Sequence, residues 1–450
     1  MSNTFIQTTQ EQQNQMLLRM GAKSIDALFH DQIPEAYDYS GQFHLPPPMS
    51  EPELVRLMTR SSEQNISSDR IVSFLGGGIY EHFIPAAVNA LAGRTEFVTS
   101  YTPYQPEASQ GTLQAFFEYQ TLLANLYSMD VSNASLYDGA TALAEAIFLV
   151  ATSKPSRRVV ILPETLHADY RQVALTCTKH SDVKLVTVPL HDGTIDLAAL
   201  KQATDSGTAA VVVQHPNYFG CLEETWDIAE VAHAAGAMLI TVCDPLSLGL
   251  LAPPGEYGAD IAVGEGQPLG LRQWAGGETL GLFTCKNDYM RKMPGRLVGC
   301  ARDRHGREGY VLTLQTREQH IRRDRATSNI CTNHAHCALR AAIYLCLMGP
   351  QGLSRVARAC VRNLRRLREA LQSVKQDSIA FSAPCFMEMV VKTATPAGLV
   401  RDEMLKHNYL AGIPLGRLGA RYENMLLVCV TECRTDEEID AFAAELTRYL

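Results

Sequence analysis

Short apolar runs alternate with longer helical segments between residues 71 and 286. A strand buried on both faces has a nearly continuous Val, Ile and Leu sequence, and consecutive parallel strands need a helix-length connection. The pattern therefore predicts an α/β fold, with a mainly parallel sheet covered by helices. We expect strands in VVILPE from Val159, KLVTVPL from Lys184, AAVVVQHPN from Ala209, MLITVCDP from Met238, DIAVGE from Asp260 and TLGLFTCK from Thr279.

Three regions follow from changes in this pattern. Residues 1–70 form a polar N-terminal arm with two short helices, too poor in apolar surface to fold alone. Residues 71–333 form the large α/β domain, in which apolar residues at three- and four-residue spacing predict a helix over about 112–129. After Asn333, a long helix, two strands and a terminal helix predict a small C-terminal α+β domain over residues 334–450.

Composition excludes several classes of function. The 48 acidic residues outnumber the 40 basic ones, which argues against a nucleic-acid partner. No apolar run approaches the roughly 20 residues that span a bilayer, and the opening residues lack the pattern of a secretory signal. Most of the twelve cysteines lie in apolar runs, where a reduced thiol acts as a small hydrophobe. We therefore expect a cytoplasmic protein without a membrane partner.

Polar residues that follow the predicted strands are the first candidates for a ligand site, because ligands bind at the carboxyl ends of parallel strands. The segment Asp138–Thr141 opens a helix with small residues and free N–H groups, which suit a phosphate or simply close packing. Asp244 could bind the pyridine nitrogen of pyridoxal phosphate or cap its own turn. His167 could stack on a cofactor ring or be a satisfied histidine at a strand end.

Enzymes that use pyridoxal phosphate need a lysine shortly after the next strand, where it forms a Schiff base. Gly266, Gln267, Pro268 and Leu269 occupy that place here. From Asp260 to the end of the following strand the only lysine is Lys286, at the far end of that strand. The sequence therefore predicts no covalently bound cofactor on this chain. The alternative is a homomeric pyridoxal-phosphate enzyme that uses Lys286 or Lys292.

Five long motifs carry a family resemblance. They are FLGGGIYEHFIPAAVNAL (74–91), TSYTPYQPEASQGTLQAFFEYQ (99–120), GEGQPLG (264–270), MPGRLVG (293–299) and GYVLTLQTREQHIRRDRATSNICTN (309–333). Through them, and over essentially its whole length, the chain closely resembles the alpha subunit (subunit 1) of the two-subunit glycine dehydrogenase (decarboxylating), the P-protein of the glycine cleavage system. The stretch 272–278 departs from the family by being more polar.

The resemblance implies an aspartate-aminotransferase-like fold, which is pyridoxal-phosphate fold type I, and an assembly of two alpha and two beta subunits. It implies that the beta subunit carries pyridoxal phosphate on a lysine and that no cofactor is held by this chain alone. The complex would act as a glycine dehydrogenase (aminomethyl-transferring): it would decarboxylate glycine and pass the aminomethyl group to the lipoyl arm of H-protein. A non-catalytic scaffold or regulatory paralogue is a further alternative.

The loop YTPYQPEASQG supplies the best candidates for catalytic residues. It groups hydrogen-bonding side chains around two prolines, and a stiff loop suits an active site shared between subunits. The alternative is that its tyrosines are core or interface aromatics. The candidates are Tyr101, Tyr104, Gln105, Glu107 and Gln110.

A second loop, Gly76–Gly78, permits close approach of a ligand or partner to the backbone, or forms a tight turn. We expect cross-subunit contacts at Gly77, Gly78, Tyr80 and His82.

The sequence also contains a small cluster of residue types that bind metals. It consists of His334, His336 and Cys337. Their spacing matches no structural zinc pattern, and no second ligand pair follows. We therefore expect no metal.

Overall fold

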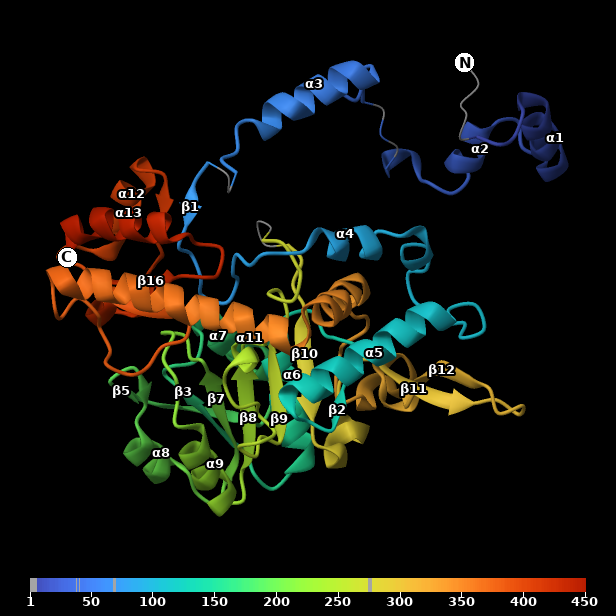
Figure 1. The fold of residues 1–450 in the computed structure, drawn as a ribbon. Coiled ribbons are helices and arrows are strands. Elements are labelled where there is room, and N and C mark those ends of the chain that lie inside the picture. Colours follow the sequence, from blue (N-terminus) through green and yellow to red (C-terminus); the bar gives the residue numbers. More distant parts are fainter. Residues whose placement is uncertain (1–5, 38, 40, 68–69, 274–276) are drawn as a thin grey trace. The chain divides into compact units, whose positions relative to one another are not determined.

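The computed structural model describes residues 6–37, 39, 41–67, 70–273 and 277–450. Part of the polar stretch 272–278 thus lies outside the described residues. The chain divides into two compact units, residues 1–66 and 67–450 (Figure 1). Among the described residues, no helix combines the length and the apolar character needed to cross a membrane.

The described residues of the first unit form three short α-helices and no apolar core of their own. Thr9 caps the first helix through a reciprocal bond with Gln12, and Ser50 donates its N–H to Glu53 at the start of the third. None of these helices buries a residue, and Leu18 is 82% exposed. That this arm cannot fold alone stays a prediction. The helices are α1 (Gln10–Met20), α2 (Ile25–His30) and α3 (Glu51–Ser62).

A seven-stranded sheet, in the order β2-β10-β9-β8-β7-β3-β4, forms the centre of the second unit. Strands β9, β8, β7, β3 and β4 are parallel, whereas β10 runs antiparallel to β9 and β2. Each predicted run contains one of these strands, so the mainly parallel sheet is confirmed. The strands are β2 (Val131–Ser132), β3 (Val159–Pro163), β4 (Lys184–Val188), β7 (Thr208–His215), β8 (Met238–Cys243), β9 (Ile261–Glu265) and β10 (Gly281–Cys285).

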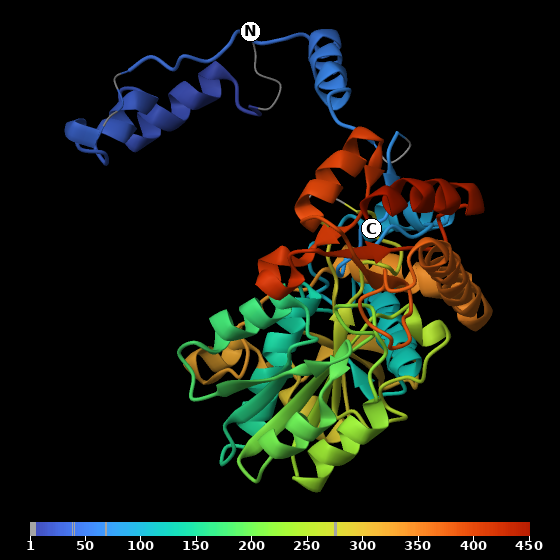
Figure 2. The same cartoon turned by 90° about the vertical axis from the view of Figure 1, so that its left-hand side faces the viewer.

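Helices cover both faces of this sheet (Figures 1 and 2). Successive strand residues point to opposite faces, so Val211 and Val213 enter one apolar core and Val212 the other. Both cores are closed to solvent, which is why the strand sequences are nearly continuous apolar runs. The covering helices are α4 (Ala86–Ala92), α5 (Gln110–Tyr127), α6 (Gly139–Ser153), α7 (Ala168–Thr178), α8 (Leu197–Ala203) and α9 (Thr225–Ala234).

The C-terminal part forms a third core around a separate small sheet. The long helix α11 (Ala335–Val374) bends at Gly349, which has a φ of 58°, immediately before Pro350. Strand β13 (Glu388–Lys392) pairs with β16 (Met425–Cys429), which also pairs with β15 (Ile413–Pro414). The remaining helices are α12 (Ala397–Lys406) and α13 (Asp436–Leu446). A domain boundary near residue 333 stays a prediction.

Several short elements complete the fold. The largest is a two-stranded hairpin of β11 (Leu297–Arg302) and β12 (Glu308–Thr313), which the sequence pattern did not predict. The others are β1 (Val72–Ser73), β5 (Leu190–His191), β6 (Thr194–Ile195), α10 (Gln319–Arg322) and β14 (Tyr409–Leu410).

Candidate functional site

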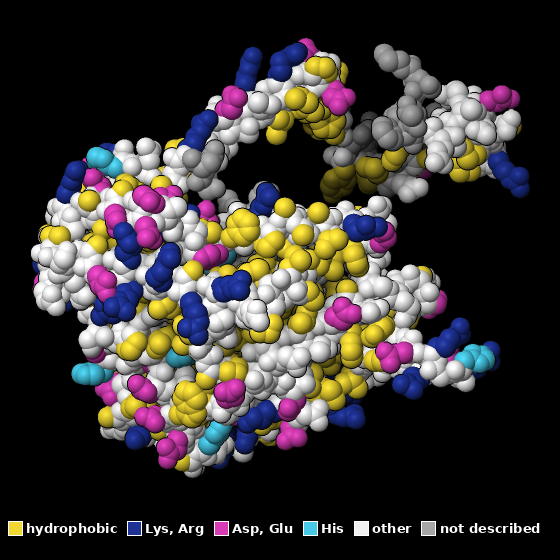
Figure 3. Space-filling view, in the orientation of Figure 1, with side chains coloured by type: hydrophobic (Ala, Val, Ile, Leu, Met, Phe, Trp, Pro, Cys, Tyr) yellow, Lys and Arg dark blue, Asp and Glu magenta, His cyan; other side chains and the backbone are white. Residues whose placement is uncertain are grey.

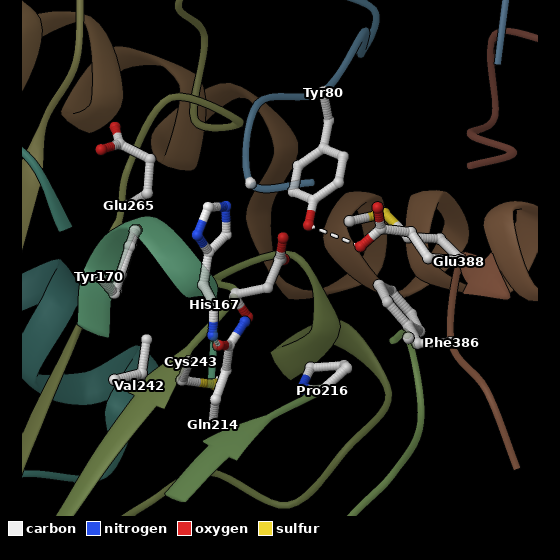
Figure 4. A pocket seen from close by; sticks show the side chains of 14 residues that line it. Tyr80, His167, Tyr170, Gln214, Pro216, Val242, Cys243, Glu265, Phe386 and Glu388 are labelled. Atoms are coloured by element: carbon white, nitrogen blue, oxygen red, sulfur yellow. Dashed lines mark hydrogen bonds between the residues drawn. The ribbon is translucent and has the colours of Figure 1, made fainter. Parts of the chain in front are cut away.

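A small cavity lies at the carboxyl ends of β7, β8 and β9, where ligands bind in open parallel sheets (Figure 4). Its volume is about 40 Å³. That is room for about three water molecules, whereas pockets for small organic ligands measure roughly 300–1,000 Å³. Side chains from three regions line it, including Tyr80, His167, Tyr170, Gln214, Asp244, Glu265 and Glu388.

Asp244 follows β8 and lines this cavity. Its Oδ1 accepts the N–H groups of Leu246, at 2.8 Å, and Ser247, at 3.1 Å. The turn-capping interpretation of Asp244 is therefore correct. Its Oδ2 is buried and has no hydrogen-bond partner among the described residues. Burial raises the pKa of this carboxyl.

His167 has both ring nitrogens satisfied within the chain. Nε2 lies 2.7 Å from the carbonyl oxygen of Gly77, and Nδ1 accepts the N–H of Asp169 at 3.1 Å. Burial lowers the pKa of the ring, so it is neutral and its Nε2–H donates. The ring packs against Tyr218, with centroids 4.5 Å apart. His167 is thus a satisfied histidine at a strand end.

Glu388 reaches the cavity from β13, and the loop Gly76–Gly78 wraps around it. Its Oε1 accepts the Gly77 N–H at 2.6 Å, and its Oε2 accepts the hydroxyl of Tyr80 at 2.8 Å (Figure 4). Burial raises the pKa of Glu388 to about 7, while these two hydrogen bonds act in the opposite direction. A Cβ added at Gly76 would overlap the Glu388 carboxyl, so the glycine allows this close approach.

Glu265 ends strand β9, close to the place where a cofactor lysine would stand. Its Oε2 accepts the Gly139 N–H at 3.0 Å, and its Oε1 accepts the N–H groups of Gln267, at 3.0 Å, and Leu280, at 2.7 Å. Gln267 in turn binds both backbone groups of Tyr80. The residues that replace the lysine therefore tie the glycine loop to the sheet. Burial raises the pKa of Glu265 to about 8.

This cavity does not fit pyridoxal phosphate. No lysine or arginine among the described residues lines it, and its space is far too small. Lys286 binds Asp260 at 3.0 Å and follows Cys285, which pairs with the first residue of β9. Because β10 is antiparallel, Lys286 lies at the opposite edge of the sheet. Lys292 bonds to the end of α6 through the Thr152 carbonyl.

The glycine-loop residues proposed as cross-subunit contacts bond within this chain. Gly77 and Tyr80 bind Glu388, and Gly78 lines the cavity. His82 is buried, with Nδ1 2.7 Å from Glu432. Their contact with another subunit stays a prediction.

The loop that supplies the catalytic candidates is separate from the cavity and faces outward. Tyr101 is 85% exposed and Tyr104 is 62% exposed. Gln105 and Glu107 are exposed as well. Gln110 accepts the N–H of Tyr310 at 2.8 Å and donates to its carbonyl at 2.9 Å, which ties the loop to the β11–β12 hairpin.

Arg296, which the sequence pattern did not mark as a candidate, anchors this loop on its buried side. It is 6% exposed, and its Nη2 donates to the Tyr104 hydroxyl at 3.2 Å. Its Nη1 donates to Thr102 at 3.3 Å and to Asn333 at 3.1 Å. The sequence sign of its role was the single arginine within the otherwise apolar motif MPGRLVG.

An apolar groove of about 540 Å³ runs beside the loop. Phe97, Val98, Tyr101 and Phe116 are among its lining residues. Figure 3 shows hydrophobic side chains gathered on this face over α4 and α5. The structure therefore brings Tyr101 to an open apolar surface.

The predicted absence of a metal at the histidine cluster stays a prediction. His334 lies 2.5 Å from the Thr279 carbonyl through Nδ1, and His336 lies 2.9 Å from the Ala92 carbonyl through Nε2. Elsewhere in the described chain, one group of three side chains has its ligand atoms close enough together for a metal ion: His82, Cys360 and Glu432. The contacts of His82 with Glu432 are those of an ordinary hydrogen-bonded pair.

The sheet order and the site at its carboxyl edge define the class: the chain has the fold of pyridoxal-phosphate enzymes of type I. Solved structures of this fold include a NifS-like protein, 11% identical, with a TM-score of 0.63 over 84% of this chain and 98% of its own. An alanine–glyoxylate aminotransferase from Nostoc is 16% identical, with a TM-score of 0.59 over 86% of this chain and 96% of its own.

A narrower match gives the family. The family model for the glycine cleavage system P-protein matches residues 3–446, so the chain belongs to that family. A probable glycine dehydrogenase (decarboxylating) subunit 1 from Chlorobium chlorochromatii is 49% identical over 98% of this chain and 99% of its own. A crystal structure of an inhibitor-bound glycine decarboxylase (P-protein) is 40% identical, covers both chains completely and has a TM-score of 0.91. The predicted family and fold are confirmed.

Proposed function

We propose that this chain is the alpha-type subunit of a glycine decarboxylase whose active site is completed by a beta subunit carrying pyridoxal phosphate on a lysine. The observation that supports this most directly is the cavity at the strand ends. This chain belongs to the P-protein family, yet its cavity is narrowed by Glu265 and Glu388, and no lysine among the described residues lines it. We propose an assembly of two alpha and two beta subunits.

The complex would decarboxylate glycine and transfer the aminomethyl group to the lipoyl arm of H-protein. Pyridoxal phosphate supplies an electron sink when bound to the partner. The part of this chain would be to hold glycine in place and exclude water, using the exposed loop at Tyr101, Tyr104, Gln105 and Glu107. Gln110 and Arg296 position that loop through the bonds described above. A cytoplasmic location stays a prediction.

The test is co-expression with a beta subunit, followed by exchange of labelled bicarbonate into glycine. Tyr104→Phe and Gln105→Ala should each lower the exchange rate by at least about tenfold, because a positioned polar group contributes this much or more to catalysis. The matched control is Gln202→Ala, an exposed glutamine on α8. Unchanged exchange in the Tyr104 and Gln105 variants would remove these residues from the site.

Two alternative functions give different outcomes. A homomeric enzyme would form a borohydride-trapped pyridoxyl adduct when the chain is purified alone with pyridoxal phosphate. Lys286 and Lys292 lie away from the cavity, so we expect none. A scaffold would leave the exchange activity of the beta subunit intact when the alpha-chain loop is mutated.

A further inference from the structure

Helix α6 begins at the cavity and has the properties of an anion site. It is 15 residues long and opens at Gly139, immediately after the cap residue Asp138. The first N–H groups of a helix have no partner within the helix, and its N-terminus carries partial positive charge. Helix starts at the carboxyl edge of a parallel sheet bind phosphate groups for this reason.

In this chain the start of α6 is already occupied by two carboxyl groups. The Gly139 N–H donates to Glu265 Oε2 at 3.0 Å, and the Thr141 N–H donates to Asp138 Oδ1 at 2.8 Å. Asp138 is the common type of cap, since it precedes its own helix in sequence. Glu265 is different, because it comes from the end of β9, which is 126 residues further along the chain.

The Glu265 carboxyl is held firmly in this position. Its other oxygen accepts the N–H groups of Gln267 and Leu280, so the carboxyl has three backbone donors as partners. Glu265 is also buried, with 9% of its surface exposed. Moving a buried carboxyl with three hydrogen bonds costs considerable free energy, because three backbone N–H groups would also lose their acceptor.

No space beside Glu265 remains for a phosphate. A Cβ added at Gly139 would overlap the Tyr170 hydroxyl and press on the backbone between Gly264 and Glu265. Tyr170 and Glu265 both line the cavity of about 40 Å³ (Figure 4). Phosphate would also meet Asp244, whose Oδ2 has no partner among the described residues.

We infer that Glu265 is a built-in occupant of the anion site at the start of α6, and that it excludes phosphate esters from this pocket. The inference goes beyond the proposed function, because it concerns this chain alone and holds whatever reaction the complex performs. It adds a second barrier to the missing lysine: even the non-covalent anchoring of a phosphorylated cofactor is prevented.

The test measures phosphate binding to the full-length chain as Glu265 is changed. The probes are inorganic phosphate and pyridoxamine 5′-phosphate, which has no aldehyde and does not react with surface lysines. Binding is followed by thermal unfolding against sodium chloride of equal ionic strength, and by ³¹P NMR. The variants are Glu265→Ala and the double variant Glu265→Ala with Asp138→Ser, which keeps a good helix cap.

Wild type should show no phosphate-specific stabilisation. Glu265→Ala should bind phosphate at least about tenfold more tightly than wild type, and the double variant more tightly still, since each change removes a carboxyl from the helix start. The matched control is Glu388→Gln, which alters a carboxyl of the same cavity that does not contact α6. That variant should resemble wild type.

Two results from the wild type and the alanine variants would overturn the inference. One is phosphate-specific stabilisation of the wild type equal to that of Glu265→Ala. The other is a folded double variant that gains no phosphate binding. If the alanine variants fail to fold, Glu265→Ser, which keeps an acceptor on a shorter side chain, replaces them. Glu265→Gln keeps the length of the side chain and should stay closed to phosphate, so binding by this variant would also contradict the inference.

Discussion

Tyr80→Phe is expected to destabilise the chain by an amount that depends on pH. The Tyr80 hydroxyl donates to Glu388 Oε2 at 2.8 Å, and both side chains are buried. Removing the hydroxyl leaves a buried carboxyl oxygen without this donor. The loss is about 1 kcal/mol when the acceptor is neutral and about 2–3 kcal/mol when it is charged.

The pH range follows from the titration of Glu388. Burial raises its folded-state pKa to about 7, above the ordinary value of 4.5, so in wild type the favourable contribution of the protonated form is lost as pH rises from 4.5 through 7. The Tyr80 hydrogen bond lowers this pKa, so Tyr80→Phe raises it further. The gap between wild type and variant should therefore be small at pH 5.5 and larger at pH 8.5, by about 1.4 kcal/mol per unit of added pKa shift.

The assay is equilibrium urea unfolding of the full-length chain at both pH values, followed by circular dichroism and fluorescence. Tyr344→Phe is the matched control, because Tyr344 is fully buried and its hydroxyl has no partner among the described residues. Its loss should be neutral or slightly stabilising at either pH. Equal costs for Tyr80→Phe and Tyr344→Phe, or a Tyr80→Phe cost that does not change with pH, would refute the reasoning.

Three further predictions concern stability. Gly220→Ala should lower the free energy of unfolding by at least about 3 kcal/mol, because Gly220 has a φ of 82° and a Cβ there would overlap the β13 backbone. The control Gly306→Ala, at a φ of 77° but with open space around the Cβ, should lose only about 1–2 kcal/mol. Thermal melts measure both. Leu367→Ala on the buried face of α11 should cost about 2–5 kcal/mol, and the exposed Arg365→Ala less than about 0.5 kcal/mol, as urea midpoints will show. Burial lowers the His215 pKa from 6.5 to about 4. The neutral ring therefore contributes about 3 kcal/mol to the free energy of unfolding above pH 6.5, and this contribution is lost as the pH falls to 4. His215→Gln should flatten the measured curve of stability against pH over this range.

Most of the central sheet could be predicted from the sequence because burial on both faces leaves a local signal. The edge strand β4 differs, since three of its five residues are exposed. Each strand from β3 to β10 in that sheet lies inside a run of apolar residues. The β11–β12 hairpin was missed because it has no such signal: every residue of β12 from Gly309 to Thr313 is only half-buried. Helix α5 begins at Gln110, two residues before the predicted start, because its first turn is set by contacts with the hairpin.

The site was predictable where its signal was local. The missing lysine is visible in GEGQPLG, and a carboxylate ending the apolar run of β9 was a readable sign of Glu265. Glu388 gave no sign, because the residue it binds, Tyr80, lies 308 positions away. The conformation of the loop at Tyr104 depends in the same way on Arg296, 192 positions away. Only the folded chain brings these groups together.

The part of α11 after the Gly349 bend belongs to two cores at once. Leu353 and Cys360 pack into the core of the large sheet, whereas Leu364 and Leu371 pack into the C-terminal core. This one helical segment thus sets the spacing and angle between the two cores. Rotation of the C-terminal core against the sheet would have to shear one set of these contacts, because Gly349 precedes both sets and cannot act as a joint between them.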